Sequence, residues 1–204
     1  MATTAADYMW FGEDFPDLAE SYCVTLVHNV PPDELLIRLG GQSAPEVNGV
    51  DALVDTAYDL WGPSITRTYF GMTTLGPWTP MIEPNGWHGV NEERALPASA
   101  GTRWISHYDN VSANNDGSFL WAEDTELRLR FELREADYLT GTRAGDLVDV
   151  IRRLGFAFSE EPTETDDNLA VPAAFALAEH LTGIRITPAL LQDTTFICGT
   201  AEFR

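Results

Sequence analysis

The chain has 204 residues, of which 44% are hydrophobic and 11% aromatic, and its formal net charge at pH 7 is −20. This length and composition are typical of a single globular domain and exclude a globally disordered chain. The negative charge argues against direct binding of nucleic acid or of an anionic membrane, and the sequence shows neither a membrane-spanning apolar run nor a secretion signal.

The first 20 residues combine acidic side chains with several large aromatic rings. Rings spaced this closely are unusual in a free tail, because leaving them in water costs free energy. We therefore expect residues 1–20 to be an acidic, aromatic N-terminal segment docked on the core of a single α+β domain that spans residues 21–204. The rings are those of Tyr8, Trp10, Phe11 and Phe15.

The next part of the chain carries strand and helix signals in turn. Residues 22–28 are apolar and β-branched, which predicts a buried strand. Residues 31–40 predict a short helix, with prolines and acidic residues at its start and a glycine after its end. Residues 41–49 are interpreted as a loop, and apolar side chains at helical spacing predict a second helix over 50–61.

The middle of the chain is rich in strand signals. In the last predicted strand, apolar and charged side chains alternate, as is typical of a half-buried antiparallel strand. The Asn-Asn-Asp-Gly sequence at 114–117 predicts a hairpin turn. The predicted strands cover residues 67–73, 78–83, 102–108, 118–122 and 127–133.

Helical periodicity returns towards the C-terminus, where helices are predicted over 144–154, 168–182 and 188–191. An acidic loop is predicted over 159–168, between the first two of these helices. Together, these elements predict an α+β fold. We expect a single domain with a central antiparallel sheet of about five to six strands and with helices at both ends of the chain.

The cysteines and histidines do not occur at the spacing of a metal site. Cys23 and Cys198 both lie in apolar runs, and without a secretion signal we expect buried free thiols in the cytoplasm rather than a disulfide between them. The motifs of serine hydrolases, phosphate-binding loops and dinucleotide-binding folds are also missing. We therefore expect no metal and no cofactor, and we assign no catalytic residue.

The most unusual motif is the Glu-Pro-Asn-Gly-Trp-His-Gly sequence that begins at Glu83. As a ligand site, Glu83, Trp87 and His88 would bind a polar ligand or carry out acid–base chemistry. As structure, the motif is a turn above a buried Trp87, which is the interpretation we favour. His107 and Asp109 share one face of a predicted strand, where an imidazole–carboxylate pair is more often structural than catalytic.

Acidic residues are concentrated towards the two ends of the chain. Residues 1–60 contain 11 acidic residues and one arginine, and residues 159–204 contain eight acidic residues and two arginines. Such a surface would attract a basic protein partner, although solubility alone is the simpler explanation of the charge and the one that we favour for it. The candidate partner-binding residues are Asp14, Asp17, Glu20, Glu160, Glu161, Asp166 and Asp167.

Several motifs follow one another in a specific order between residue 22 and about residue 191: they include Cys23-Val-Thr-Leu-Val27, Glu83-Pro-Asn-Gly-Trp87, and Phe175-Ala-Leu-Ala-Glu179 with Leu181-Thr-Gly183. In this order they resemble an actinobacterial, Streptomyces-type family described only as a domain of unknown function. The resemblance implies a single cytoplasmic α+β domain from a bacterium with a GC-rich genome, which agrees with the absence of lysine. It implies no reaction, because the family has no active site to transfer.

Two functional hypotheses follow, and they belong to different classes. The first is a non-enzymatic protein-interaction module, of the immunity-protein or DNA-mimic type, that binds a basic partner. The alternative is a small-molecule sensor or enzyme with a tryptophan-lined pocket and with Glu83, His88 or His107 at its polar end. The lack of a catalytic motif favours the first hypothesis, and the oligomeric state is not predicted. The tryptophans are Trp78, Trp87, Trp104 and Trp121.

Overall fold

The computed structural model describes residues 3–60, 66–113, 116–158 and 164–202. Within these ranges, nine strands form one antiparallel sheet in the order β2-β9-β3-β4-β1-β5-β6-β7-β8. The strands are β1 (Ser21–His28), β2 (Gln42–Asn48), β3 (Arg67–Met72), β4 (Trp78–Pro84), β5 (Arg103–Asn110), β6 (Asp116–Glu123), β7 (Glu126–Glu132), β8 (Glu135–Thr140) and β9 (Thr195–Glu202).

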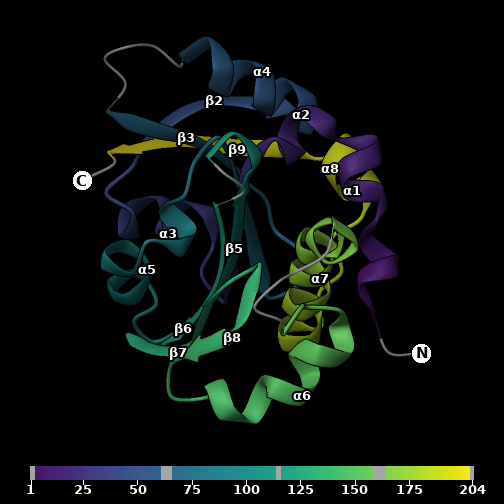
Figure 1. The fold of residues 1–204 in the computed structure, drawn as a ribbon. Coiled ribbons are helices and arrows are strands. Elements are labelled where there is room, and N and C mark those ends of the chain that lie inside the picture. The colour runs from purple at the N-terminus through teal and green to yellow at the C-terminus, as the bar shows by residue number, and fades with distance from the viewer. Residues whose placement is uncertain (1–2, 61–65, 114–115, 159–163, 203–204) are drawn as a thin grey trace.

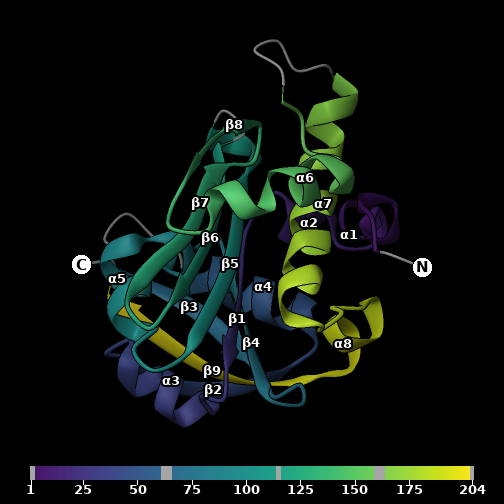
Figure 2. The same ribbon diagram turned by 90° about the horizontal axis from the view of Figure 1, so that it is seen from below.

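Helices cover both faces of this sheet (Figures 1 and 2). Helices α1, α2, α4, α6, α7 and α8 cover the face that we call the α7 face, and α3, η2 and α5 cover the opposite face, the α3 face. No helix in the described part of the chain is long and apolar enough to cross a membrane. The helices are η1 (Ala5–Tyr8), α1 (Trp10–Asp14), α2 (Pro16–Ala19), α3 (Pro32–Arg38), α4 (Val50–Leu60), η2 (His88–Val90), α5 (Glu92–Ala98), η3 (Val111–Ala113), α6 (Ala144–Leu154), α7 (Glu164–Thr182) and α8 (Pro188–Asp193).

Strand β1 lies near the middle of the sheet and contributes to both hydrophobic cores. Successive side chains of a strand point to opposite faces. Tyr22, Val24 and Leu26 are accordingly buried on the α7 face, whereas Cys23 and Val27 are buried on the α3 face. Because both faces are covered, the sequence of this strand is a continuous run of buried residues, as predicted for 22–28.

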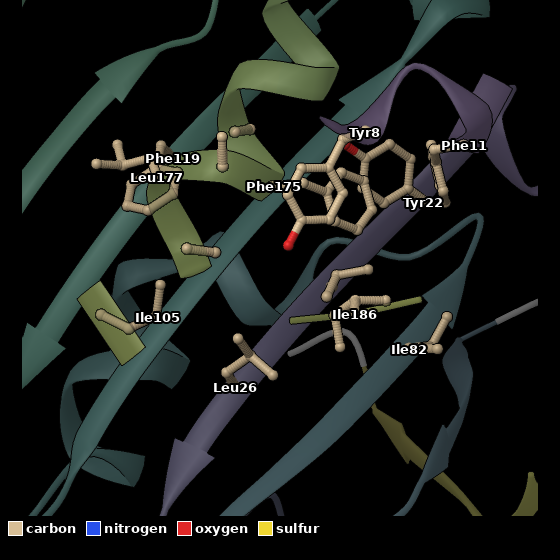
Figure 3. Close-up of a cluster of buried hydrophobic side chains, with 14 of the residues drawn as sticks. Tyr8, Phe11, Tyr22, Leu26, Ile82, Ile105, Phe119, Phe175, Leu177 and Ile186 are labelled. Atoms are coloured by element: carbon tan, nitrogen blue, oxygen red, sulfur yellow. The ribbon is translucent and has the colours of Figure 1, made fainter. Parts of the chain in front are cut away.

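The core of the α7 face is organised around the ring of Phe175 in α7 (Figure 3). The centroid of this ring lies 4.6 Å from that of Phe11, 5.3 Å from that of Tyr8 and 5.9 Å from that of Tyr22. The imidazole of His107, in β5, packs edge-on at 4.4 Å. The ring of Phe175 therefore joins the N-terminal segment, α7 and the centre of the sheet.

The α+β class is confirmed, but the expected sheet of about five to six strands is wrong. The additional strands are β2, β8 and β9. Strands β2 and β8 form the two edges of the sheet, their side chains are mostly exposed, and their pairing shifts register, so neither shows a regular apolar alternation. Strand β9 follows the last helix and lies inside the sheet, so the described chain ends in a strand and not in a helix.

Several helices agree with the sequence-based expectation, and others do not. The helices predicted over 31–40, 50–61, 144–154 and 188–191 are present as α3, α4, α6 and α8. Helix α7 begins at Glu164, so part of the expected loop over 159–168 is helical, and residues 159–163 lie outside the described residues. Residues 114 and 115 of the predicted hairpin turn also lie outside them.

Helix α5 was not predicted from the sequence. It begins after Asn91, whose side chain accepts a hydrogen bond from the backbone N–H of Glu93 at 3.0 Å. Its short length and the proline at position 97 conceal the usual helical periodicity.

Replacing Phe175 with alanine is expected to lower the free energy of unfolding by about 3–5 kcal/mol, because the substitution leaves a cavity at the centre of a packed aromatic cluster. Urea denaturation of the purified protein measures this change. The matched control is Phe158→Ala, at a half-buried position where the ring contacts Arg152, and its effect should be clearly smaller. An equal loss in both variants would contradict the central role of Phe175.

Candidate functional site

The sheet separates the side chains that were predicted to form a ligand site. Glu83 stands directly opposite Cys23 across β4 and β1, and it therefore lies on the α3 face. His107 stands opposite Val24, and Asp109 stands opposite Tyr22, which places both of them on the α7 face. A ligand held by Glu83 on one face does not reach His107 or Asp109 on the other.

Glu83 is completely buried and holds the turn that follows β4. Its carboxylate accepts hydrogen bonds from the backbone N–H of His88 at 3.1 Å and from that of Gly89 at 2.9 Å. The Nδ1 atom of His88, which is also buried, lies 3.8 Å from Oε2 of Glu83. Burial raises the pKa of Glu83, while His88 and the two backbone N–H groups act in the opposite direction. These contacts are those of a structural anchor.

Trp87 lies in the same turn, but it is not buried beneath it as expected. Its side chain is 40% exposed, so the interpretation of Trp87 as a core anchor is wrong. The turn itself is present, with Asn85 in the left-handed conformation at φ 54°. With Glu83 fixing the backbone at His88 and Gly89, the indole stands at the surface of the α3 face.

His107 and Asp109 each have a partner other than one another. The Nδ1 atom of His107 lies 3.1 Å from the hydroxyl of Tyr22, and the Asp109 carboxylate is paired with the guanidinium of Arg134. Burial lowers the pKa of His107 to about 3, so its imidazole is neutral at pH 7. Burial raises the pKa of Asp109, and Arg134 opposes that shift. The contacts of His107 with Tyr22 and of Asp109 with Arg134 are therefore typical of structural interactions and not of a catalytic pair.

The tryptophan-lined pocket of the alternative hypothesis does not form as predicted. Trp78 and Trp121 are buried on the α7 face, and Trp104 is buried on the α3 face. The indole N–H of Trp104 donates a hydrogen bond to the carbonyl of Gly89 at 2.8 Å. These three rings belong to two separate cores on opposite faces of the sheet.

The two cysteines are free thiols, and both are buried. Cys23, in β1, belongs to the core of the α3 face, and Cys198, in β9, belongs to the core of the α7 face. Strands β3 and β4 lie between them in the sheet. Within the described ranges, no group of three or more His, Cys, Asp or Glu side chains is arranged to hold a metal ion.

An open groove of about 790 Å³ lies on the α3 face, and sequence analysis did not identify it. The backbone register explains how it forms: Tyr108 stands opposite Ser118, which stands opposite Glu132, so all three point to this face. The turn after β4 and the start of α5 form one wall. We call it the Trp87 groove, and its lining residues are Trp87, Val90, Asn91, Glu92, Glu93, Tyr108, Asn110, Ala113, Asp116, Ser118, Arg130 and Glu132.

The Trp87 groove is acidic, with Arg130 as the one arginine among its lining residues. Arg130 is already engaged, because its guanidinium lies 2.7 Å from the carboxylate of Glu92 and 3.6 Å from that of Glu132. Asp116 and Glu93 have no arginine partner in the part of the chain that the structure describes. Burial raises the pKa of Glu132, and the nearby charge of Asp116 raises it further.

The predicted partner-binding residues lie partly on a second acidic surface. Asp14, Asp17 and Glu20 are exposed on or beside α1 and α2, and α2 packs against α4 (Figure 1). Helix α4 adds further exposed carboxylates, and in the described chain no arginine pairs with any of this set. We call this surface the acidic helical face, and its residues are Asp14, Asp17, Glu20, Asp51, Asp55 and Asp59.

The remaining predicted partner-binding residues are not placed on this surface. Glu160 and Glu161 lie outside the described residues. Asp166 and Asp167 belong to the first turns of α7, where side chains are not described. The contribution of α4 was not predicted from the sequence, because its three aspartates are spaced along a helix that the apolar pattern marks only as a core element.

Comparisons with known proteins identify the family without assigning a reaction. All of residues 1–204 match a family described as "Family of unknown function (DUF6461)". The comparison with curated proteins found no match. The comparison with solved structures found no match either.

The neutral state of His107 makes the fold sensitive to acid. The unfolded chain, with a histidine pKa near 6.5, takes up a proton before the folded chain does, because the folded pKa is about 3. The free energy of unfolding should therefore fall as the pH drops below 6.5, by up to about 1.4 kcal/mol per pH unit from this group. Urea denaturation between pH 7 and pH 5 measures the slope.

The variant His107→Gln is expected to show a weaker pH dependence than the natural protein, because it lacks this titration. The control is His180→Gln, which changes an exposed histidine at the end of α7 and should keep the natural slope. Identical slopes for the natural protein and His107→Gln would contradict the assignment.

Glu83→Gln is expected to lower the free energy of unfolding by about 1–3 kcal/mol, because one amide oxygen cannot accept from two separated backbone N–H groups and one buried donor is left unpaired. Thermal or urea unfolding tests this. Glu46→Gln makes the same chemical change at an exposed position in β2 and should have little effect. Equal stability of the two variants would show that Glu83 does not anchor the turn.

Proposed function

Because the chain belongs to the DUF6461 family, whose function is unknown, we propose a function from its own surface: a non-enzymatic interaction module that binds a basic protein partner. The acidic helical face is the proposed contact surface. The observation that carries the proposal is that α1 packs on α2 and α2 on α4, and that six exposed carboxylates stand on or beside these helices without an arginine among the described residues to neutralise them.

Apolar side chains are exposed at the end of α4, the helix that carries part of the acidic helical face. Tyr58 is 42% exposed and Leu60 is 54% exposed, both at the end of α4. Burial raises the pKa of Tyr58, and the charges of Glu20 and Asp17 raise it further, so its ring lies close to the carboxylates of α2. Unpaired charge accelerates the encounter with a basic surface, and an exposed aromatic ring adds short-range contact area.

The separation of the candidate catalytic groups supports a non-enzymatic role. Glu83 binds backbone N–H groups on one face, and His107 is a neutral core residue on the other. An immunity-protein or DNA-mimic type of module accords with the net charge of −20. The cytoplasmic location belongs to the same proposal and is supported by two buried free thiols, and the actinobacterial origin by the absence of lysine.

The test compares two triple variants with the same loss of negative charge. Asp17→Asn, Glu20→Gln and Asp55→Asn together neutralise part of the acidic helical face. Affinity capture from the native host at low salt first isolates a stoichiometric basic protein, and its binding to each variant is then measured by surface plasmon resonance. The triple variant of the acidic helical face should bind roughly tenfold more weakly or worse, mainly through slower association.

The control variant carries Glu46→Gln, Asp137→Asn and Asp149→Asn, which are exposed acidic residues on β2, β8 and α6. It should bind the partner nearly as well as the natural protein. If both variants weakened partner binding equally, the effect would depend on net charge alone and not on the acidic helical face. Failure to isolate any basic partner at low salt would contradict the proposed function.

A further inference from the structure

We propose that the Trp87 groove binds an organic cation, namely a guanidinium or primary ammonium group carried on a short aliphatic chain. The groove lies on the α3 face, because Tyr108 and Val90 in its lining belong to that core. The acidic helical face lies on the other side of the sheet, because α4 packs into the core of the α7 face. The inference therefore goes beyond the proposed function and does not depend on it.

The size and lining of the groove suit a small organic molecule. Its volume of about 790 Å³ falls in the range of small-molecule sites, roughly 300–1,000 Å³. Trp87 offers an exposed indole at one side, and Tyr108 adds a second, more buried aromatic ring. The faces of indole and phenol rings attract cations, and they pack against the aliphatic carbons that carry the charged group.

The charges of the groove select a cation. Glu92, Glu93, Asp116 and Glu132 supply four carboxylates, and Arg130 satisfies two of these, Glu92 and Glu132. An arriving guanidinium or ammonium group would contact Asp116 and relieve its repulsion with Glu132 without displacing Arg130. An anionic ligand would face an excess of negative charge at the same place.

Ser118 adds a hydrogen-bonding group to the lining of the groove. Its side chain is only 5% exposed and lies on the sheet between Tyr108 and Glu132. Its hydroxyl makes no hydrogen bond to another described residue, and Ser118 lines the groove, so the hydroxyl oxygen is available to a ligand there. The N–H of a bound guanidinium or ammonium group would supply the donor that this hydroxyl oxygen lacks.

A bare metal ion fits the groove less well than an organic cation. The acidic side chains do not form a group of three metal-binding residues anywhere in the described ranges. A metal ion also gains nothing from the aliphatic and aromatic surface that Trp87 provides. An organic cation uses both the carboxylates and the rings.

The test is isothermal titration calorimetry of the whole protein with agmatine, spermidine and a capped Gly-Arg-Gly peptide, with 1-butanol as the uncharged comparison. We expect saturable binding of at least one cation with Kd below about 1 mM and none of 1-butanol. Tighter binding of agmatine or spermidine identifies a free amine as the ligand. Tighter binding of the peptide identifies an arginine side chain of a protein.

Two groove variants make the assignment specific. Asp116→Asn should weaken binding of the cation about tenfold, because a charge-assisted contact is lost. Trp87→Ala should weaken it roughly threefold to tenfold through loss of the indole face. Both positions are exposed, and thermal unfolding confirms that each variant is folded.

The matched control is Asp55→Asn, which removes the same charge from the acidic helical face. It should leave binding of the amine unchanged, just as Asp116→Asn should leave binding of the basic protein partner unchanged. No saturable binding of any of the three cations would overturn the proposal. Equal weakening by Asp116→Asn and Asp55→Asn would overturn it as well, because it would reduce the effect to net charge.

Discussion

A single sheet that is buried on both faces is the constraint on which the rest of the structure depends. Because side chains alternate along each strand, the residues of β1, β4 and β5 point to one or the other of two separate faces, each with its own hydrophobic core. Glu83 in β4 and His107 in β5 flank β1 opposite its consecutive residues Cys23 and Val24, and they therefore point to opposite faces of the sheet. The same alternation brings Tyr108, Ser118 and Glu132 together on one face and so forms the Trp87 groove.

The buried polar residues shape the surface from below. The Glu83 carboxylate holds the backbone of His88 and Gly89, and this fixes the turn from which Trp87 projects. On the other face, Phe175 joins α7 to the N-terminal segment, which carries part of the acidic helical face. Glu83 and Phe175 therefore hold in place the backbone that carries the two proposed binding surfaces. The proposed contacts themselves are made by exposed acidic and aromatic side chains.

Sequence reasoning identified the α+β class, most of the long helices and the strands with regular apolar alternation, because buried faces leave a periodic pattern. It missed β2 and β8, since edge strands bury few side chains, and β9, in which Gly199 and threonines interrupt the pattern. The groove was harder to predict, because it depends on strand register across β5, β6 and β7. Asp14, Asp17 and Glu20 were selected from charge alone, but their proximity to α4 required the fold.

The central claim is that one sheet separates two surfaces that recognise cations, the Trp87 groove and the acidic helical face. Backbone amide NMR during a titration with agmatine or spermidine, whichever binds more tightly, tests this claim most directly. The account predicts shifts at Trp87, Tyr108, Asp116 and Ser118, which saturate together, and unchanged amides along α4. Shifts centred on α1, α2 and α4, or on the buried amides next to His107, would contradict it. Shifts on α1, α2 and α4 would mean that the amine binds at the acidic helical face. Shifts next to His107 would mean that it binds at a site in the core.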